Sequence, residues 1–389
     1  MFFSYLLCLG TFYLFVGGHI VWGGLHKPAL LDLSKKPVGS DFLTYWAASK
    51  VARTRPPVAV FSREAMTEVE REVIGAEISP RIWNYPPSFL LMVLPLSLLP
   101  YLFSFLIWLA VTCGGYVYVM RRIIPKHPAA WLCLLFPGAV SNFLYGQNGF
   151  LSTAFLGLGL LLLDRHPFVG GSVLGLLSYK PQMACLIPLA LTAGRCWQAL
   201  AGALTAAVGL ALASLLWLGS EVWLGFFKNL PLAAGLMDKA HLWEKMPTVF
   251  AAARSAGASH QLAMFIQAVS TALVIIAVAR VWSRGVSLPS RCSVLVCGVI
   301  LATPYAFAYD LTILALPFAW LGWEAYTNDS IAGESCLLLV WAGLSWFSLG
   351  LPGILTWVGN LPLSQAALIA MFLLAIYRAD RPYTSPSAS

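Results

Sequence analysis

The stretch YLFSFLIWLAVTCGGYVYVM, Tyr101–Met120, decides the fold class, because it runs for 20 residues without a charged side chain. A helix of about 20 apolar residues is long enough to cross the hydrocarbon core of a bilayer. The whole chain of 389 residues is similar, with 59% hydrophobic residues, 10% charged residues and a mean hydropathy of +0.78. Soluble domains carry about 25% charged residues. The sequence therefore predicts an all-α integral membrane protein.

Other apolar runs extend this pattern along the chain. The further runs longer than 18 residues are 1–24, 197–218, 261–280 and 361–378. Shorter runs, broken by polar or Gly/Pro clusters, lie at 129–144, 148–163, 168–180, 181–194, 291–304, 311–326 and 336–351. Pairing the shorter runs as hairpins predicts a multi-spanning bundle of about 12 spans, within about 10 to 13. We expect one polytopic domain over residues 1–380, with a retained first span and a disordered tail at 381–389.

The positions of the charges indicate the sidedness. Basic residues gather in short turns between apolar runs, which the positive-inside rule places in the cytoplasm. The long polar loops 25–84 and 219–260 then lie outside, together with the other polar tips. We therefore expect a multi-pass membrane protein in which every polar cluster that could do chemistry lies on the outer side. The net charge of +8 is explained by these turns and predicts no nucleic-acid partner.

The first outer loop predicts two short interfacial helices. One covers 41–54, and the second begins at Ser62 and ends near Gly75. Asp41 at the start of the first helix has two interpretations. It is either an N-cap, or a partly desolvated general base beside the aromatic side chains of the same helix.

Several polar residues lie within or between apolar runs. Lys180 is either a snorkelling lysine at the end of a span or a ligand for phosphate. Asp310 is either an N-cap or part of a cavity, and Gln147 and Asn148 form either a simple turn or part of a sugar site. The second outer loop contains His241 and Arg254, for which a solvated or headgroup-facing helix is the simpler explanation.

Several chemistries have no signature in the chain. There is no phosphate-binding G-x-x-x-x-G-K-[ST] loop, complete G-x-G-x-x-G fingerprint, H-E-x-x-H motif or D-x-D sequence. The eight cysteines show no metal-ligand spacing. We therefore expect neither a metal nor a cofactor, and any sugar donor should be carried on a lipid.

Six segments occur in an order typical of a known family. They are DFLTYWAASKVART, WNYPPSFLLMVLPLSLLP, YGQNGFLSTAFLGLGLLLLDR, GGSVLGLLSYKPQMACLIPLAL, KMPTVFAAARSAG and TPYAFAYDLTILALP. Together they resemble glycosyltransferase family 87, over about residues 1–380. The resemblance implies a GT-C fold with the active site on the outer side of the membrane. The Arg- and Pro-rich ARTRPPVAVFS departs from the family's Gly-x-x-Pro-Tyr turn and leaves the acceptor preference open.

The resemblance also implies a reaction and roles for individual residues. It predicts transfer, with inversion, of a hexose from a polyprenyl-phosphate donor to a hydroxyl of an envelope lipid or glycan, with mannose as the first candidate. Asp41 would be the catalytic base, and Lys180 and Gln182 would bind the donor phosphate. To these we add Arg81 and Arg254 as our own candidates for binding this phosphate. Sugar or acceptor would contact Tyr45, Tyr85, Gln147, Asn148, His241 and Asp310. The expected partners are this donor, this acceptor and membrane lipids. The alternatives are another prenyl-linked sugar, a transporter of lipid-linked sugars or small solutes, and a non-catalytic membrane scaffold.

Overall fold

The computed structural model describes residues 36–79, 81–239, 246–327 and 363–380, together with four single positions, Gly18, Leu30, Leu31 and Trp243. Within these residues every named element is helical, and the only β-pairing is an isolated bridge between Leu31 and Pro37. The prediction of an all-helical chain is confirmed for this part. The predicted span 336–351 and the predicted tail lie outside the described residues, and so does the predicted span 1–24 apart from Gly18.

Three helices are long and apolar enough to cross a membrane: α5 (Tyr101–Ile123), α11 (Trp197–Leu218) and α14 (His260–Trp282). The bent pair η3 (Pro128–Leu135) and α6 (Pro137–Tyr145) makes a possible fourth span. Among the described residues, length and composition thus support three or four spans, and the figure of about 12 spans stays a prediction. The runs predicted as shorter spans form shorter or interrupted helices.

These interrupted runs have local causes in the sequence. Pro181 ends one apolar run, because a proline lacks the N–H that would continue the helix. The predicted run 168–180 becomes α8 and η4, and the run 181–194, which begins at this proline, becomes α9 and α10. Their bounds are Pro167–Gly175, Leu176–Tyr179, Pro181–Ala184 and Leu186–Ala193.

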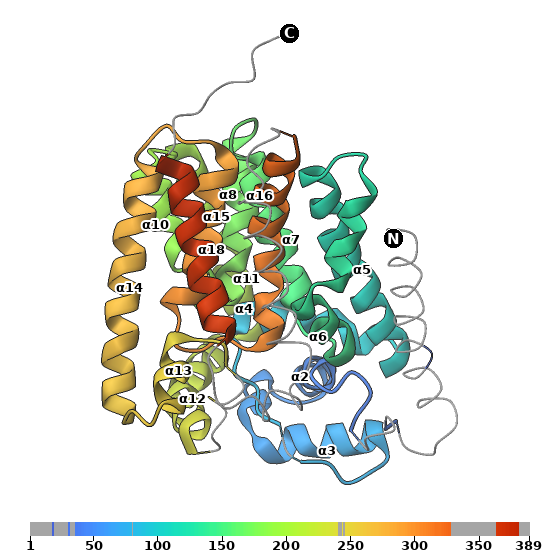
Figure 1. The fold of residues 1–389 in the computed structure, drawn as a ribbon. Coiled ribbons are helices and arrows are strands. Elements are labelled where there is room, and N and C mark those ends of the chain that lie inside the picture. Colours follow the sequence, from blue (N-terminus) through green and yellow to red (C-terminus); the bar gives the residue numbers. More distant parts are fainter. Residues whose placement is uncertain are drawn as a thin grey trace. The chain divides into compact units, whose positions relative to one another are not determined.

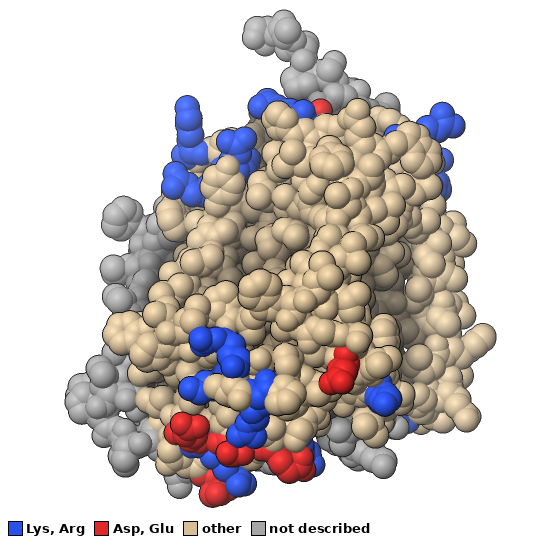
Figure 2. All heavy atoms as spheres, turned by 180° about the vertical axis from the view of Figure 1, so that it is seen from behind, with Lys and Arg blue, Asp and Glu red and all other residues tan. Residues whose placement is uncertain are grey.

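Exposed apolar side chains cover the long helices. Phe103, Trp217 and Ile276, one from each candidate span, are 63–74% exposed to the surroundings of the chain. Figure 2 shows wide areas of one face without any charged side chain, next to small groups of acidic and basic residues. Such surface is typical of contact with lipid, and it supports a helical membrane protein.

The chain divides into two compact units, which are described separately. The first comprises residues 1–114, 140–148 and 208–236, and the second comprises 115–139, 149–207 and 237–389.

In the first unit, α2 (Phe42–Thr54) is almost completely buried and packs on the short helices around it. These neighbours are η1 (Pro57–Phe61), α3 (Arg63–Ile74), α4 (Pro87–Val93) and η2 (Leu94–Leu98). Both helices predicted for the first outer loop are confirmed as helices. Ser62 caps α3 by accepting a hydrogen bond of 3.2 Å from Ala65 N, and Gly75 ends it with φ +72°.

The predicted second outer loop, 219–260, contains more helix than the sequence suggested. Residues Ser220–Lys239 form α12, a helix of 20 residues that continues through Pro231. Glu221 in its first turn places a negative charge at the positive end of the helix dipole. The mixed polar and apolar residues of this segment therefore form a helix, where the sequence analysis expected a long loop.

In the second unit, α15 (Leu288–Ala302) is the central helix and is buried at every position from Cys292 to Ala302. It packs against α14, α10 and two later helices, α16 (Ala315–Thr327) and α18 (Leu363–Asp380). Figure 1 shows α14, α15 and α18 as neighbouring helices. This unit also contains α7 (Gly149–Leu162), α13 (Val249–Ser255) and η6 (Ala308–Leu314), as well as η3, α8, η4 and α9.

Candidate functional site

Asp41 is the N-cap residue of α2, but its side chain does not cap the helix. Its carboxylate is directed to other partners of the first unit. Oδ2 accepts a hydrogen bond of 3.1 Å from Gln147 Nε2, and Oδ1 lies 3.4 Å from both Arg81 Nη1 and Ser40 Oγ. The cap interpretation of Asp41 therefore explains its position in the chain, but not the contacts of its carboxylate.

Backbone contacts hold Gln147 beside Asp41. The Asp41 N–H donates to the carbonyl oxygen of Tyr145 over 2.9 Å, which joins the start of α2 to the 145–148 tip. Gly146 turns this tip with φ +69°, and a Cβ there would lie 2.6 Å from Phe42 Cβ. Only glycine combines this left-handed conformation with such a close approach. The Gly-flanked tip therefore has a specific structural task, which is to present Gln147 to Asp41.

Gln147 connects Asp41 to two tyrosines. Its Oε1 accepts hydrogen bonds from Tyr45 Oη, from Tyr85 Oη at 3.4 Å and from the Asn148 N–H at 3.2 Å. The two tyrosine hydroxyls are 3.1 Å apart. Because Oε1 faces these donors, the amide N–H group of Gln147 is directed to the carboxylate of Asp41. Four predicted sugar- or acceptor-binding residues are thus brought together in one network.

Aromatic side chains of the first unit pack around this network. Tyr45 contacts Trp83, Tyr85 and Phe89 with ring centroids 6.4, 5.6 and 5.2 Å apart. Trp83 and Phe89 stack with an interplanar angle of 11°. Tyr45, Trp83 and Phe89 are at most 1% exposed, so these rings form the packed support of the network, and Tyr85 is the half-buried member of the group.

The surroundings of Asp41 change its acidity. Burial raises the pKa of the Asp41 carboxyl above its ordinary value of 3.8, although the hydrogen bond from Gln147 and the charge of Arg81 act in the opposite direction. The side chain itself remains 31% exposed, so a hydroxyl from outside can approach it. A carboxylate with a raised pKa that stays accessible is suited to accept a proton.

Arg81 is the cation of this site. Its Nη1 donates to the carbonyl oxygen of Ser40 as well as facing Asp41, and its side chain is 24% exposed. Its Nε is buried and has no hydrogen-bond partner among the residues that the structure describes. Arg81 thus contacts Asp41 and the backbone that precedes it, and its contact with the donor phosphate stays a prediction.

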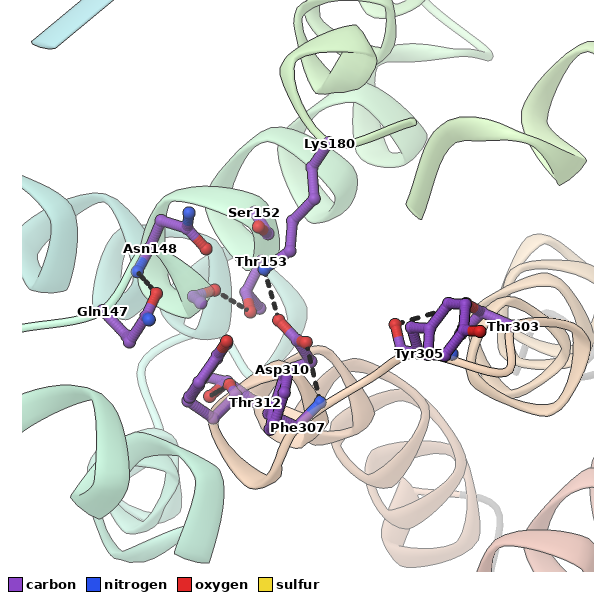
Figure 3. A network of polar contacts seen from close by, with 12 residues as sticks. Gln147, Asn148, Ser152, Thr153, Lys180, Thr303, Tyr305, Phe307, Asp310 and Thr312 are labelled. Carbon is purple, nitrogen blue, oxygen red and sulfur yellow. Dashed lines mark hydrogen bonds and ion pairs between the residues drawn. The ribbon is translucent and has the colours of Figure 1, made fainter. Parts of the chain in front are cut away.

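The second unit contains a separate polar group, centred on Lys180 and Asp310. The Lys180 ammonium forms an ion pair with Asp310 Oδ1, and both side chains are at most 3% exposed. Asp310 Oδ2 also accepts a hydrogen bond of 3.0 Å from the Phe307 N–H. Figure 3 shows Lys180 extending toward Asp310. Asp310 takes part in capping as its simpler interpretation predicts, because this bond from Phe307 belongs to a capping box at the start of η6, but its carboxylate also binds Lys180. Lys180 does not follow its simpler interpretation, because its side chain is only 3% exposed.

Tyr309 contacts this pair, and a second hydrogen bond lies beside Lys180 in the chain. The Lys180 ammonium lies 5.2 Å from the centroid of the Tyr309 ring, which gives a cation–π contact. Ser152 Oγ and Tyr179 Oη are 2.7 Å apart in a buried hydrogen bond. The sequence analysis gave no role to Tyr179 or Tyr309. Tyr179 directly precedes Lys180 and Tyr309 directly precedes Asp310, and this adjacency is the only feature of the sequence that could have indicated them.

The remaining predicted residues take other positions. Arg254 donates to the Ala258 carbonyl oxygen over 2.9 Å and lies over the Trp243 ring, so its described contacts are local. Gln182 is half-buried in α9. His241 lies outside the described residues. In the described part of the chain, no three His, Cys, Asp or Glu side chains are grouped as a metal would require.

Comparison with known proteins gives one match. A family model described as glycosyltransferase family 87 matches residues 83–304, which is more than half of the chain. No curated protein and no solved structure matches the chain. The matched range includes Tyr85, Gln147 and Lys180, whereas Asp41 and Asp310 lie outside it.

Proposed function

The chain belongs to glycosyltransferase family 87, and on this premise we propose that it transfers a hexose from a polyprenyl-phosphate donor to a hydroxyl of an envelope lipid or glycan. Mannose is the first candidate for the hexose. The reaction would proceed with inversion and with Asp41 as the base, on the outer face of a bacterial plasma membrane. The observation that carries this proposal is the arrangement at Asp41, a partly exposed carboxylate with a raised pKa that Gln147 and Arg81 orient.

The proposed step is a single displacement at the anomeric carbon. The acceptor oxygen forms a bond to this carbon while its proton passes to Asp41. The bond between the anomeric carbon and the phosphate oxygen breaks, and its electron pair leaves with the polyprenyl phosphate. A positioned general base accelerates such a step by about 10²–10⁴-fold.

Gln147 and Arg81 would assist Asp41 without reacting themselves. Gln147 donates from Nε2 to one carboxylate oxygen of Asp41, and Arg81 donates from Nη1 to the other. Together these contacts fix the plane of the carboxylate. Both interactions lower the pKa of Asp41 against the effect of burial. These two contacts therefore favour the ionised form of the base, whereas burial favours its protonated form.

Tyr45 and Tyr85 would provide the contact surface for the sugar or acceptor. Their hydroxyls reach the same amide oxygen that anchors Gln147, so a ligand there would contact groups already joined to the base. Asn148 belongs to the same tip and is assigned to the same role.

Lys180 is assigned to the donor phosphate as a point charge, with Gln182 beside it in the chain. A phosphate that approached Lys180 would compete with Asp310 for the ammonium. Asp310 then has a defined role in the proposal, because it neutralises Lys180 until the donor arrives. A buried charge without such a counter-ion would be strongly unfavourable.

The test uses the purified full-length protein in nanodiscs. The protein is incubated with a panel of polyprenyl-phosphate sugars and a membrane lipid extract, and the release of free polyprenyl phosphate is measured. Turnover with one donor that is lost in folded Asp41→Asn supports the transferase and identifies the sugar. Glu64→Gln is the matched control, because Glu64 is an exposed carboxylate of the same region, in α3. Full turnover of Asp41→Asn would refute the assignment of the base.

A further inference from the structure

Several helices of the second unit end together on one side of it. The part of α5 that belongs to this unit packs on α7, with Gly115 against Ala154 and, one turn further along both helices, Val119 against Gly157. The contacts advance along both helices in the same direction. The end of α5 therefore lies beside the end of α7.

The starts of α8 and α11 lie on this same side. α8 follows α7 after a short turn, so it begins where α7 ends. Gly171 and Gly175 of α8 lie against the backbone of α11 at Ala199 and Ala203 respectively, which shows that α8 and α11 run in the same direction. The turn that precedes α11 therefore faces the same side as the turn that precedes α8.

Ion pairs join further helix ends to this group. They link the start of α15 to the turn after α7, the end of α14 to the end of α18, and the end of α18 to the end of α16. The start of α15 also meets the end of α14, because the Arg291 guanidinium lies 5.4 Å from the centroid of the Trp282 ring. The pairs are Arg291–Asp164, Arg280–Asp380, Arg284–Asp380 and Arg378–Glu324, with N···O distances of 2.7, 2.8, 2.8 and 3.7 Å. Among the described residues, these pairs engage every acidic side chain of this end.

Five further cations of this end have no acidic partner in the described part of the chain. All five side chains belong to exposed residues, in the last turn of α5, just after it, and in the turns before α8 and α11. They are Arg121, Arg122, Lys126, Arg165 and Arg195. This basic surface therefore carries positive charge that the described acidic side chains do not balance.

Exposed aromatic side chains accompany the basic surface. Trp131 of η3, Trp197 at the start of α11, and Tyr326 and Tyr377 near the ends of α16 and α18 are 42–66% exposed. The Arg121 guanidinium lies 5.6 Å from the centroid of the Trp131 ring, which joins the two kinds of side chain. Trp and Tyr gather where the acyl chains of a bilayer meet its headgroups. The combination indicates a surface that meets lipid headgroups rather than a partner in open water.

Two of the five cations occupy a backbone conformation that favours glycine. Lys126 and Arg195 have φ of +57° and +53°, and no other non-glycine residue in the described part of the chain has a positive φ. After α10, the Arg195 and Cys196 N–H groups donate to the Thr192 and Leu191 carbonyl oxygens over 3.0 and 2.8 Å. Glycine is the usual residue at the left-handed position of this C-terminal motif. A cation is thus kept where glycine would fit the backbone better, and such an outlier points to a use for the charge.

We propose that the basic surface binds the headgroup phosphates of anionic phospholipids. The five cations contact the phosphates, and the exposed Trp and Tyr rings lie between the headgroups and the acyl chains. The positive-inside rule assigns this surface to the cytoplasmic leaflet, whose anionic lipids attract basic segments. The inference goes beyond the proposed function and does not depend on it, because none of the candidate-site residues belongs to this surface.

The first test measures which lipids the full-length protein retains. The protein is reconstituted into bilayers of equal amounts of phosphatidylglycerol and phosphatidylcholine, extracted in a mild detergent, and its bound phospholipids are quantified by mass spectrometry. Wild type should retain phosphatidylglycerol in excess. Arg121→Gln/Arg122→Gln and Arg165→Gln/Arg195→Gln should each lower the ratio of the two lipids by about fivefold or more, since one cation near an anionic surface contributes about that factor.

Arg63→Gln/Lys228→Gln is the matched control, because it removes two exposed cations of α3 and α12, outside the basic surface. Its lipid ratio should equal that of wild type. Equal retention of the two lipids by wild type would overturn the proposal. So would a wild-type ratio in both pairs of variants at the basic surface, or a loss in the control as large as theirs.

A second test separates lipid from soluble phosphate. The excess of phosphatidylglycerol should shrink as the salt concentration rises from about 0.05 M to about 0.5 M, because salt screens exposed charges. Glycerol phosphate at millimolar concentration should leave the excess unchanged, since it lacks the acyl chains that hold a lipid beside the aromatic rings. Displacement by glycerol phosphate would assign the surface to a soluble anion and overturn the assignment to lipid.

The third test uses the left-handed position of Arg195. Arg195→Gly relieves the backbone, so it should raise the Tm in detergent without added phospholipid, while it lowers the retention of phosphatidylglycerol. Arg195→Lys keeps the charge and should match wild type in both measurements. If Arg195→Gly kept the wild-type lipid ratio, or if Arg195→Lys lost it, the charge at this position would not serve lipid binding and the proposal would fail.

Discussion

Gln147 donates a hydrogen bond of 3.1 Å from Nε2 to Oδ2 of Asp41, although 106 positions separate the two residues in the chain. The donor faces the carboxylate because the amide oxygen is taken by Tyr45, Tyr85 and the Asn148 N–H. This relationship gives the candidate base a defined orientation, and it can be tested directly.

Gln147→Leu should weaken the proposed reaction and change its pH dependence. The substitution removes a hydrogen bond to a charged group, which contributes about 1.5–3 kcal/mol, so turnover should fall by about 10- to 100-fold. Because Gln147 lowers the pKa of Asp41, its loss raises that pKa further, and the acid limb of the profile of kcat/KM against pH moves to higher pH. The profile with a saturating acceptor is the measurement. An acid limb at the wild-type pH would show that Gln147 does not act on the base.

Lys180 and Asp310 should behave as a coupled buried pair. Removing one partner of such a pair leaves an uncompensated charge, so Lys180→Met and Asp310→Asn should each lower the free energy of unfolding by about 3–5 kcal/mol. The double variant Lys180→Met/Asp310→Leu should recover most of this loss. Unfolding in detergent, followed by circular dichroism, measures all three.

The exposed pair of Arg280 and Asp380 is the control for that series. Its side chains are 44% and 37% exposed, so Asp380→Asn should cost no more than about 1 kcal/mol. Small effects of both single substitutions at Lys180 and Asp310 would favour a lysine that reaches the membrane surface, as the simplest reading of the sequence suggests.

The sequence predicts local features of this protein more completely than distant ones. Ser62 and Gly75 delimit α3 because capping depends on neighbouring residues, and the apolar run at Tyr101 becomes a long helix for the same reason. The number of spans does not follow in the same way. Short apolar runs interrupted by proline are compatible both with separate spans and with broken helices.

Contacts between distant residues could not be predicted from the sequence. Lys180 and Asp310 were both selected as candidates, but their pairing joins positions 130 apart and depends on how η6 packs on α7. The burial of Glu70 was not predicted either, because a glutamate in a charged amphipathic helix is expected to face water. Only the packing of α3 on α2 shows that this particular glutamate faces inward.

Two glycines of α11 should respond oppositely to the same substitution. A Cβ on Gly202 would lie 2.1 Å from the Phe168 carbonyl oxygen, whereas a Cβ on Gly209 would meet no atom of the described residues within 4 Å. Gly202→Ala should therefore destabilise the protein by about 1–3 kcal/mol through overpacking. Gly209→Ala should stabilise it by about 0.5–1 kcal/mol, because alanine loses less conformational entropy in a helix. Equal Tm shifts for the two variants would contradict the close packing of α11 on α8.

The substitution Asp41→Asn distinguishes the two interpretations of Asp41, general base or helix cap, because they predict opposite pH dependences of its contribution to stability. A carboxylate that serves as a cap has a lowered pKa, so its contribution to stability appears as the pH rises above about 4. Burial instead raises the pKa of Asp41, so its stabilising contribution is present below 3.8 and is lost as the pH rises through the folded value. Asn does not titrate. We therefore expect the Tm of Asp41→Asn to rise relative to the Tm of wild type between about pH 4 and about pH 7, while turnover is lost.

Ser62→Ala provides the comparison, because the Ser62 side chain does cap a helix. Removing this cap should lower the free energy of unfolding by about 1 kcal/mol at either pH. A Tm of Asp41→Asn that falls behind wild type as the pH rises would return Asp41 to the role of a cap.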